Sequence, residues 1–241
     1  MNKLYLSNIR KLLNQIENSE EVITTVAEKC ADAICNNKLL YFFGTGHSSI
    51  VCEEPFYRAG GLACISPILV PMLMLHESAS KSSVYERIEG LGTKIIGQSG
   101  IGEGDVIFLI SNSGRNCCII DAAIEAKKVG ATTVAITSLK HTKSVTSRHS
   151  SGKLLYEICD YTLDNFGEPG DASVKIGENK KIGPTSSVID IILVNSLIID
   201  IVEILEKRGI KPPIFTSANI DEGDLENKSI LETYRKRIPV L

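Results

Sequence analysis

The sequence lacks the features that mark several common protein classes. Its 241 residues carry 26 lysines and arginines against 29 aspartates and glutamates, so no basic excess indicates binding to nucleic acid. The two glycine-rich nucleotide motifs, GxGxxG and GxxxxGK[ST], are both missing. We therefore expect neither a nucleic-acid partner nor one of the common nucleotide-binding sites.

Paired cysteines and long apolar runs are missing as well. The seven cysteines contain no CxxC pair, which favours reduced, mostly buried thiols over disulfides or zinc, and we expect no metal and no cofactor. The longest apolar stretch, 188–205, is interrupted by Asp190, Asn195 and Asp200, which favours a buried helix over a membrane span. The first residues lack the apolar stretch of a signal peptide, so we expect a cytoplasmic protein without a membrane partner.

What is present is an alternation of strand and helix patterns. With 43% hydrophobic residues, the chain can bury the core of one α/β domain. Apolar runs predict strands, and stretches with helical spacing lie between them, an alternation that favours right-handed βαβ units and a doubly wound sheet. The expected strands are 39–43, 62–65, 106–110, 132–136 and 161–163, and the expected helices are two within 2–36, one at 48–58 despite Pro55, and one at 116–129.

In the second half of the chain we expect an exposed loop, a long apolar helix and a C-terminal tail. The stretch 167–183 is rich in glycine, lysine and glutamate and is expected to be an exposed loop, after which a long apolar helix begins near Pro184. The tail from Lys211 onward is expected to dock on a neighbour. We expect one domain over 1–241, with a helical arm (1–38), a core (39–208) and a C-terminal tail (209–241).

Two short turns carry most of the functional information. One apolar run ends in Ser-Asn-Ser-Gly-Arg-Asn (111–116) and another in Gly-Thr-Gly-His-Ser (44–48), and a helical pattern follows each. Such a turn gathers hydroxyls and unpaired backbone amides at a helix amino end, which favours a phosphate dianion. Gly114 lets the backbone approach an anion closely. A single turn of this kind is equally typical of a capped helix, but two in one chain predict a phosphate site.

Both turns resemble the two phosphate-binding segments of the SIS (sugar isomerase) family, and the segment 121–138 resembles the helix and strand that follow in that family. The similarity runs from about residue 20 to 207. The segments 52–61 and 147–153 resemble a stand-alone branch that is similar to phosphoheptose isomerases and N-acetylmuramic acid 6-phosphate etherases. The resemblance implies a three-layer α/β fold with a five-stranded parallel sheet in flavodoxin-like order behind an N-terminal helical arm. It further implies a sugar phosphate at the strand carboxyl ends, and homodimers or homotetramers. The predicted phosphate-binding residues are Gly46, Ser48, Ser111, Asn112, Ser113, Gly114, Asn116, Thr185 and Ser186.

Three residues are candidates for acid–base catalysis. Isomerisation of a sugar phosphate needs a group that removes a carbon-bound proton, and a carboxylate or a histidine suits this role. Glu54 resembles the catalytic glutamate of the heptose isomerases, and His47 stands within the first turn. His76, beside Glu77, is the third candidate. The structural alternatives are a solvated glutamate pair or a salt-bridged helix end for Glu54, and a histidine that only caps the turn for His47.

The sequence departs from the heptose isomerases at one point, because the helix expected to start near Thr185 contains no histidine. The favoured hypothesis is a metal-independent sugar-phosphate isomerase. A non-catalytic phosphosugar sensor is a second hypothesis. A lyase of the etherase type is a third, in which Glu54 acts with Glu86 or Glu89. His149 is expected in a loop or an interface.

Overall fold

The computed structural model describes residues 2–217 and 223–241 and is built around a five-stranded parallel sheet. The strand order is β2-β1-β3-β4-β5, which confirms the flavodoxin-like sheet. The bounds of the strands are β1 (Leu40–Gly44), β2 (Ile65–Pro67), β3 (Val106–Ile110), β4 (Thr132–Thr137) and β5 (Tyr161–Asp164). Every residue of β1 and of β3 is buried, as expected for strands covered on both faces.

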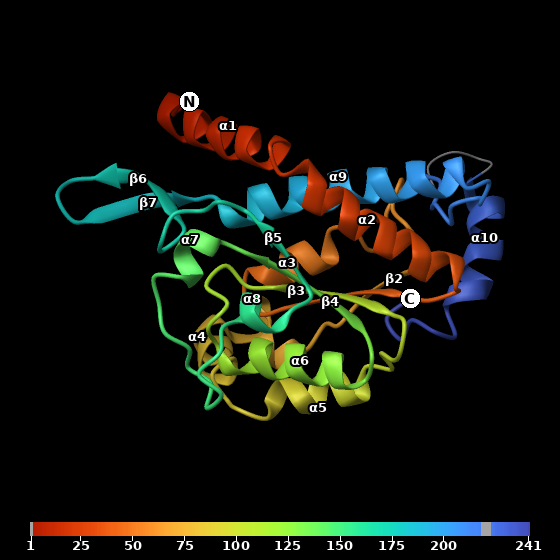
Figure 1. The fold of residues 1–241 in the computed structure, drawn as a ribbon, viewed down its shortest axis with the longest axis horizontal. Coiled ribbons are helices and arrows are strands. Elements are labelled where there is room, and N and C mark those ends of the chain that lie inside the picture. The colour runs from red at the N-terminus through yellow and green to blue at the C-terminus, as the bar shows by residue number, and fades with distance from the viewer. Residues whose placement is uncertain (1, 218–222) are drawn as a thin grey trace.

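Two helical layers cover the sheet (Figure 1). The first layer contains α1 (Lys3–Glu17), α2 (Glu20–Cys35), α3 (Ser48–Glu53) and α9 (Ser186–Lys207). The second contains α4 (Leu75–Tyr85), α5 (Leu91–Gln98), α6 (Cys117–Lys128) and α8 (Leu155–Ile158). Shorter or peripheral elements are η1 (Pro71–Leu73), α7 (Leu139–Thr142) and α10 (Gly223–Tyr234). None of the helices in the described part of the chain has both the length and the apolar character that a membrane crossing needs.

Several predicted bounds shift for physical reasons. The helix expected at 48–58 ends at Glu53, because Pro55 has no amide hydrogen to continue the helical hydrogen bonds. The second strand covers 65–67 rather than 62–65, although Leu62 forms an isolated bridge with Ile214.

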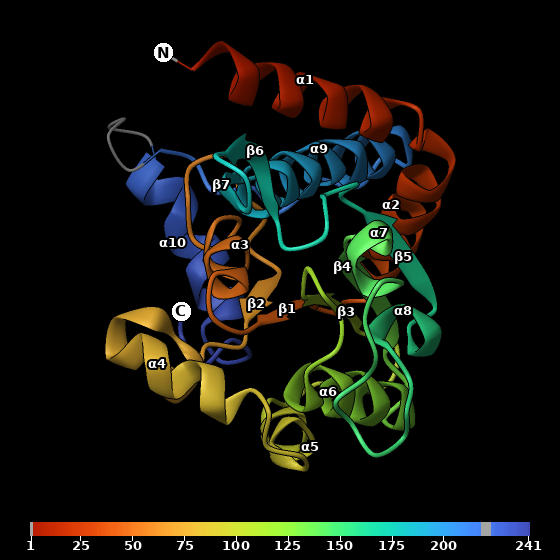
Figure 2. The same cartoon turned by 90° about the vertical axis from the view of Figure 1, so that its left-hand side faces the viewer.

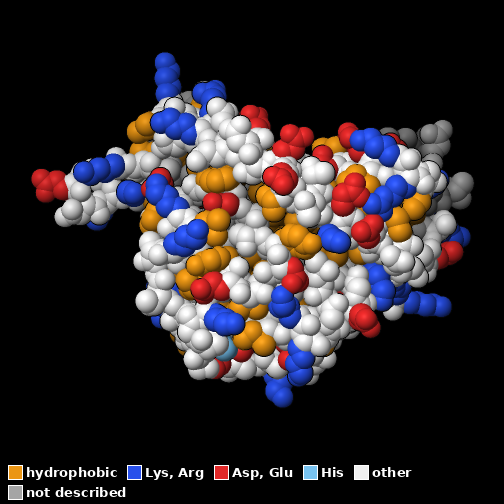
Figure 3. Space-filling view, in the orientation of Figure 1, with side chains coloured by type: hydrophobic (Ala, Val, Ile, Leu, Met, Phe, Trp, Pro, Cys, Tyr) orange, Lys and Arg blue, Asp and Glu red, His pale blue; other side chains and the backbone are white. Residues whose placement is uncertain are grey.

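The stretch 167–183, expected to be a loop, contains most of a β-hairpin made of β6 (Ala172–Ile176) and β7 (Lys180–Pro184). This hairpin projects from the body beside α1 and carries exposed lysines (Figure 3). At its base, Asp171 accepts hydrogen bonds from the amides of Thr185 (3.1 Å) and Ser186 (2.8 Å). The hairpin is therefore tied to the first turn of α9.

The described part of the tail packs on its own chain. Phe215 and Ile238 are buried. The amide of Phe215 donates to the carbonyl of Gly61 (3.0 Å), and the Arg237 guanidinium donates to the carbonyl of Asn37 (2.7 Å). The C-terminal segment therefore lies near the amino ends of the strands, opposite the edge where the two turns lie (Figure 1).

Candidate functional site

The two turns lie side by side at the carboxyl edge of the sheet. Gly44 pairs with Ile110 in the register of β1 and β3, so the first turn (44–48) and the second turn (111–116) follow neighbouring strands. Figure 2 looks onto this edge, with β1 and β3 near its centre. After β1 the chain adds β2 on one side of β1, and after β3 it adds β4 and β5 on the other side, so the strand order reverses direction between β1 and β3. In open α/β sheets, such a switch point is where ligands bind.

The second turn leaves its backbone donors open. Gly114, at φ +57°, donates its amide to the carbonyl of Ser111 (3.2 Å) and thereby closes the turn. Among the described residues, the Ser113 hydroxyl has no hydrogen-bond partner, and neither do four backbone amides, those of Asn112, Ser113, Arg115 and Asn116. These donors lie just before the amino end of α6, where the helix dipole also favours negative charge. The turn is therefore suited to hold an anion.

A buried polar chain supports the second turn from below. The Asn165 side-chain amide donates to Oδ1 of Asn112 (3.1 Å) and to Oδ1 of Asp190 (2.9 Å). Burial raises the pKa of Asp190 to about 7, against the opposing effect of the hydrogen bond from Asn165. Asn165 thus engages the Asn112 side-chain oxygen, whereas the Asn112 side-chain nitrogen is buried without a partner among the described residues.

The first turn uses two of its amides, those of Gly46 and Ser48, for hydrogen bonds within the chain. The amide of Gly46 donates to the carbonyl of Leu73 (2.9 Å), and that of Ser48 donates to the carbonyl of Thr45 (3.1 Å). The Thr45 hydroxyl donates to Oε2 of Glu86 (2.8 Å). The Ser48 hydroxyl has no partner among the described residues, and His47 is exposed. The amides of Thr45 and His47 also lack a partner among the described residues, so this turn presents two free backbone donors against four in the second turn.

The three acid–base candidates lie on different elements. Glu54 follows α3, where it forms an ion pair with Arg58 and accepts a hydrogen bond from the Asn195 side chain of α9 (3.4 Å). His76 lies on α4 with its side chain 68% exposed and 4.0 Å from Glu77. Its neighbour Leu75 packs against the first turn at Gly46. The histidine candidates thus border the first turn, whereas Glu54 faces α9.

Two of the predicted phosphate-binding residues, Thr185 and Ser186, are bound to a carboxylate of the same chain. Thr185 is 1% exposed, and its amide donates to the Asp171 carboxylate, as do the amide and hydroxyl of Ser186 (2.8 and 2.6 Å). The amino end of α9 is therefore occupied by a carboxylate of the same chain.

Sequence reasoning missed Arg148, close to the second turn, and named Glu86 only as a possible partner of Glu54. The guanidinium of Arg148 donates to Oδ1 of Asn116 (2.6 Å), and Glu86 is bound to the first turn through Thr45. Arg148 comes from a loop 32 positions downstream of Asn116, so no local pattern could have placed it there. The described residues contain no cluster of three or more His, Cys, Asp or Glu side chains placed to hold a metal ion.

Comparison with known families adds to this geometry. The SIS domain model matches residues 4–138, which is more than half of the chain. The chain belongs to the SIS domain family. A UPF0309 protein of Shouchella clausii is 43% identical over 237 residues, covering 97% of this chain and 96% of the relative. A UPF0309 protein of Thermoanaerobacter pseudethanolicus is 40% identical over 241 residues, covering 99% and 97%.

Solved structures with this SIS fold share little sequence with the chain. The NanR protein of Vibrio vulnificus in complex with ManNAc-6P matches 98% of this chain and 68% of that chain, at a TM-score of 0.52 and 17% identity. A phosphoheptose isomerase of Francisella tularensis matches 84% of this chain and 100% of that chain, at a TM-score of 0.52 and 12% identity. At these identities the likeness supports the fold alone.

Proposed function

We propose that this SIS protein binds a sugar phosphate, with the phosphate held by the second turn. The observation that carries the proposal is the set of four unpaired amides and one free hydroxyl there, next to the Ser48 hydroxyl of the neighbouring turn. Backbone amides before a helix are well suited to a phosphate dianion. The ManNAc-6P complex of the structurally similar NanR protein is consistent with this assignment.

We further propose that the protein is a metal-independent isomerase of this ligand in the cytoplasm. The sugar extends from the second turn across the first, toward His47 and His76. Glu54 acts as the base after it leaves its ion pair with Arg58, and Asn195 orients its carboxylate. Proton transfer between adjacent carbons of an aldose or ketose needs only such positioned acid and base groups.

The test combines binding with turnover. A panel of sugar phosphates is expected to raise the melting temperature, while the free sugars leave it unchanged. A stabilising ligand is then incubated with the wild type, with Glu54→Gln and with Glu53→Gln, whose exposed side chain makes it a matched control. We expect Glu54→Gln to bind but not convert the ligand, and Glu53→Gln to do both. Failure of every sugar phosphate to bind contradicts the proposed function.

A lyase is the second candidate, favoured by the position of Glu86. This carboxylate accepts a hydrogen bond from Thr45 of the first turn, whereas that of Glu89 is engaged by Ser150. Mass spectrometry of the product separates the alternatives. An isomer keeps the mass of the ligand, and a lyase product has lost a substituent. Binding without any turnover by the wild type identifies a sensor.

We also propose that the protein forms a homodimer through α9, with a dimer of dimers as the larger assembly. Val188, Ile192 and Ile199 are 40%, 37% and 59% exposed and recur at helical spacing along one face of α9. Ile50 of the adjacent α3 is 44% exposed as well. Light scattering is expected to give a dimer or tetramer for the wild type and a monomer for the double variant Ile192→Glu/Ile199→Glu. An unchanged mass for the variant contradicts this interface.

A further inference from the structure

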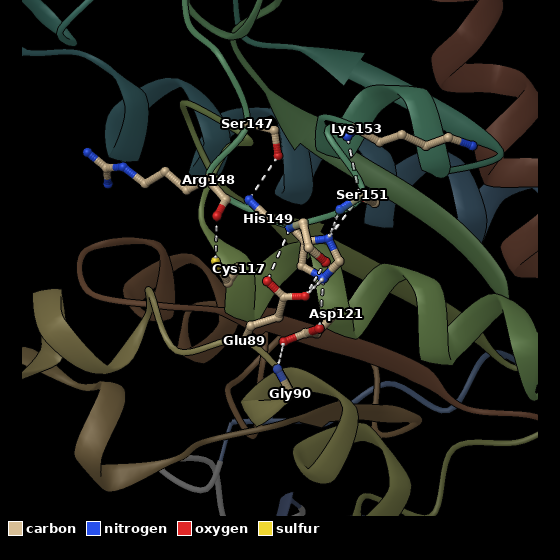
Figure 4. Close-up of polar contacts among 10 residues, drawn as sticks. Glu89, Gly90, Cys117, Asp121, Ser147, Arg148, His149, Ser151 and Lys153 are labelled. Atoms are coloured by element: carbon tan, nitrogen blue, oxygen red, sulfur yellow. Dashed lines mark hydrogen bonds and ion pairs between the residues drawn. The ribbon is translucent and has the colours of Figure 1, made fainter.

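A buried histidine fixes the 143–154 loop against α6 (Figure 4). The Nδ1 atom of His149 accepts a hydrogen bond from the amide of Ser151 (3.0 Å), so its Nε2 carries the proton and donates to Oδ1 of Asp121 (3.1 Å). The side chains of His149 and Asp121 are 8% and 6% exposed. Asp121 also accepts from the amide of Gly90 (2.6 Å), which joins the segment after α4 to the same cluster.

This attachment places the preceding residue, Arg148, over the second turn. Its amide donates to the carbonyl of Arg115 (2.9 Å), and its carbonyl accepts from the Cys117 thiol (3.1 Å). The side chain extends away from His149 in Figure 4, and its guanidinium donates to Oδ1 of Asn116 (2.6 Å). The Arg148 backbone is therefore fixed at two points before any ligand binds.

Three cationic side chains in this region form no ion pair in the part of the chain that the structure describes. Within the described residues, none of Arg87, Arg115 and Arg148 forms an ion pair, and Nε of Arg115 is buried without a hydrogen-bond partner. Partial desolvation of the Arg148 guanidinium lowers its pKa, and the neighbouring charges of Arg115 and Arg87 lower it further. The nearby carboxylate of Glu86 acts in the opposite direction but accepts its hydrogen bond from Thr45. Like charges gathered at one point are costly unless an anion joins them.

The phosphate does not require these guanidinium groups. The four free amides of the second turn and the Ser113 hydroxyl already offer it donors at the amino end of α6. The Arg148 guanidinium lies next to Asn116 at the end of the same turn, and the Arg148 amide donates to the carbonyl of Arg115. One N–H of Arg148 is taken by Asn116, and the rest of the planar fork matches a two-oxygen acceptor.

We propose that Arg148 and Arg115 form a second anion subsite beside the second turn, so that the ligand is a sugar phosphate that also carries a carboxylate. The proposal rests on the proposed function, because it assumes that the second turn holds the phosphate. It narrows the substrate class from neutral sugar phosphates to sugar-acid phosphates.

Matched ligand pairs test the subsite. 6-Phosphogluconate and glucitol 6-phosphate differ only in a carboxylate against a hydroxymethyl group, and so do glucuronate 1-phosphate and glucose 1-phosphate. Dissociation constants are measured by calorimetry at fixed ionic strength. We expect the acid of at least one pair to bind the wild type about ten-fold more tightly than its neutral partner, as a charge-assisted hydrogen bond allows.

Three variants assign that preference to particular residues. Arg148→Met is expected to bring the acid and its neutral partner within about two-fold of each other while the neutral ligand binds as before, since Arg148 is exposed and no core packing is lost. Lys153→Met removes an exposed charge from the same loop, but its side chain points the other way in Figure 4, so the preference should persist. Ser113→Ala should weaken both members of a pair equally.

The possible failures are distinguishable. Neutral and acidic ligands that bind the wild type equally in both pairs overturn the second subsite and leave the proposed function standing. Equal weakening of both members by Arg148→Met also overturns it, because Arg148 would then be a phosphate contact. If no sugar phosphate binds at all, both proposals fall.

Discussion

The first and the second turn both leave a buried strand through glycine, yet their backbone amides differ in state. In the first turn the amides of Gly46 and Ser48 donate to carbonyls of the same chain, and Thr45 is fastened to Glu86. In the second turn the amide of Gly114 donates to the carbonyl of Ser111, but those of Asn112, Ser113, Arg115 and Asn116 have no partner among the described residues. Turns at equivalent positions of neighbouring strands thus differ in how many of their backbone amides are already hydrogen-bonded within the chain. A hydroxyl-rich turn is suited to bind an anion only where its backbone amides are not already hydrogen-bonded to the surrounding chain.

The largest expected effect comes from a substitution that disrupts the internally bonded backbone of the first turn and lowers the stability of the protein. A Cβ at Gly44 would lie 2.7 Å from Cβ of Ser48 and 2.9 Å from its carbonyl oxygen, so Gly44→Ala forces backbone movement. We expect a loss of about 2 to 3 kcal/mol in the free energy of unfolding, typical of overpacking. Gly46→Ala is the matched control, because its Cβ would meet only Leu75 at 3.9 Å. The positive φ of Gly46 should cost about 1 kcal/mol. Urea unfolding measures both, and equal losses contradict this account.

The next prediction concerns Asp190, which is joined to the second turn through Asn165, and the pH dependence of the protein's stability. The folded protein holds the Asp190 proton up to about pH 7, whereas an aspartate in the unfolded chain loses it near pH 4. The folded state therefore binds the extra proton between these values, and wild-type stability falls as the pH rises through this window. Asp190→Asn keeps the acceptor for Asn165 without this penalty. Relative to the wild type, it should gain on the order of 2 kcal/mol between pH 5 and pH 8.

Asp200→Asn is the control for this pH profile. Burial also raises the pKa of Asp200, on the same helix, but the residue is partly exposed and should give a smaller change. Chemical unfolding at several pH values gives the two difference curves. A flat difference for Asp190→Asn would show that this carboxylate is not protonated within the fold.

The smallest expected effects come from removing one hydroxyl near each turn and comparing the changes in ligand affinity and in stability. Ser113→Ala removes a hydroxyl without an internal partner and should weaken sugar-phosphate binding about ten-fold with little change in stability. Ser49→Ala removes a buried hydroxyl that donates to the carbonyl of Gly46 (2.8 Å). It should cost about 1 kcal/mol of stability and leave affinity within about two-fold. Calorimetry and urea unfolding of both variants check this, and reversed roles would contradict it.

The parts of this fold that sequence reasoning predicted correctly are those with strong local signals. The uninterrupted apolar runs at β1 and β3 and the glycines after them placed both turns at one sheet edge. The hairpin β6–β7 was missed because most of its residues are exposed, which leaves no alternation to read. The capture of Thr185 by Asp171 and the approach of Arg148 to Asn116 depend on contacts between distant segments. No spacing rule reports such contacts. The roles of Glu54, His47 and His76 remain predictions.

The link between Asp171 and the start of α9 has a practical consequence for engineering. Because Asp171 and the strand pairing hold the base of the hairpin, a change at its tip, around Glu178 and Asn179, should not move the sheet edge where the ligand is expected. Exposed tips of this kind tolerate inserted sequence. An affinity tag or a fluorescent reporter spliced between these two residues should leave folding and ligand recognition intact, and it offers a handle on the protein that avoids both chain ends.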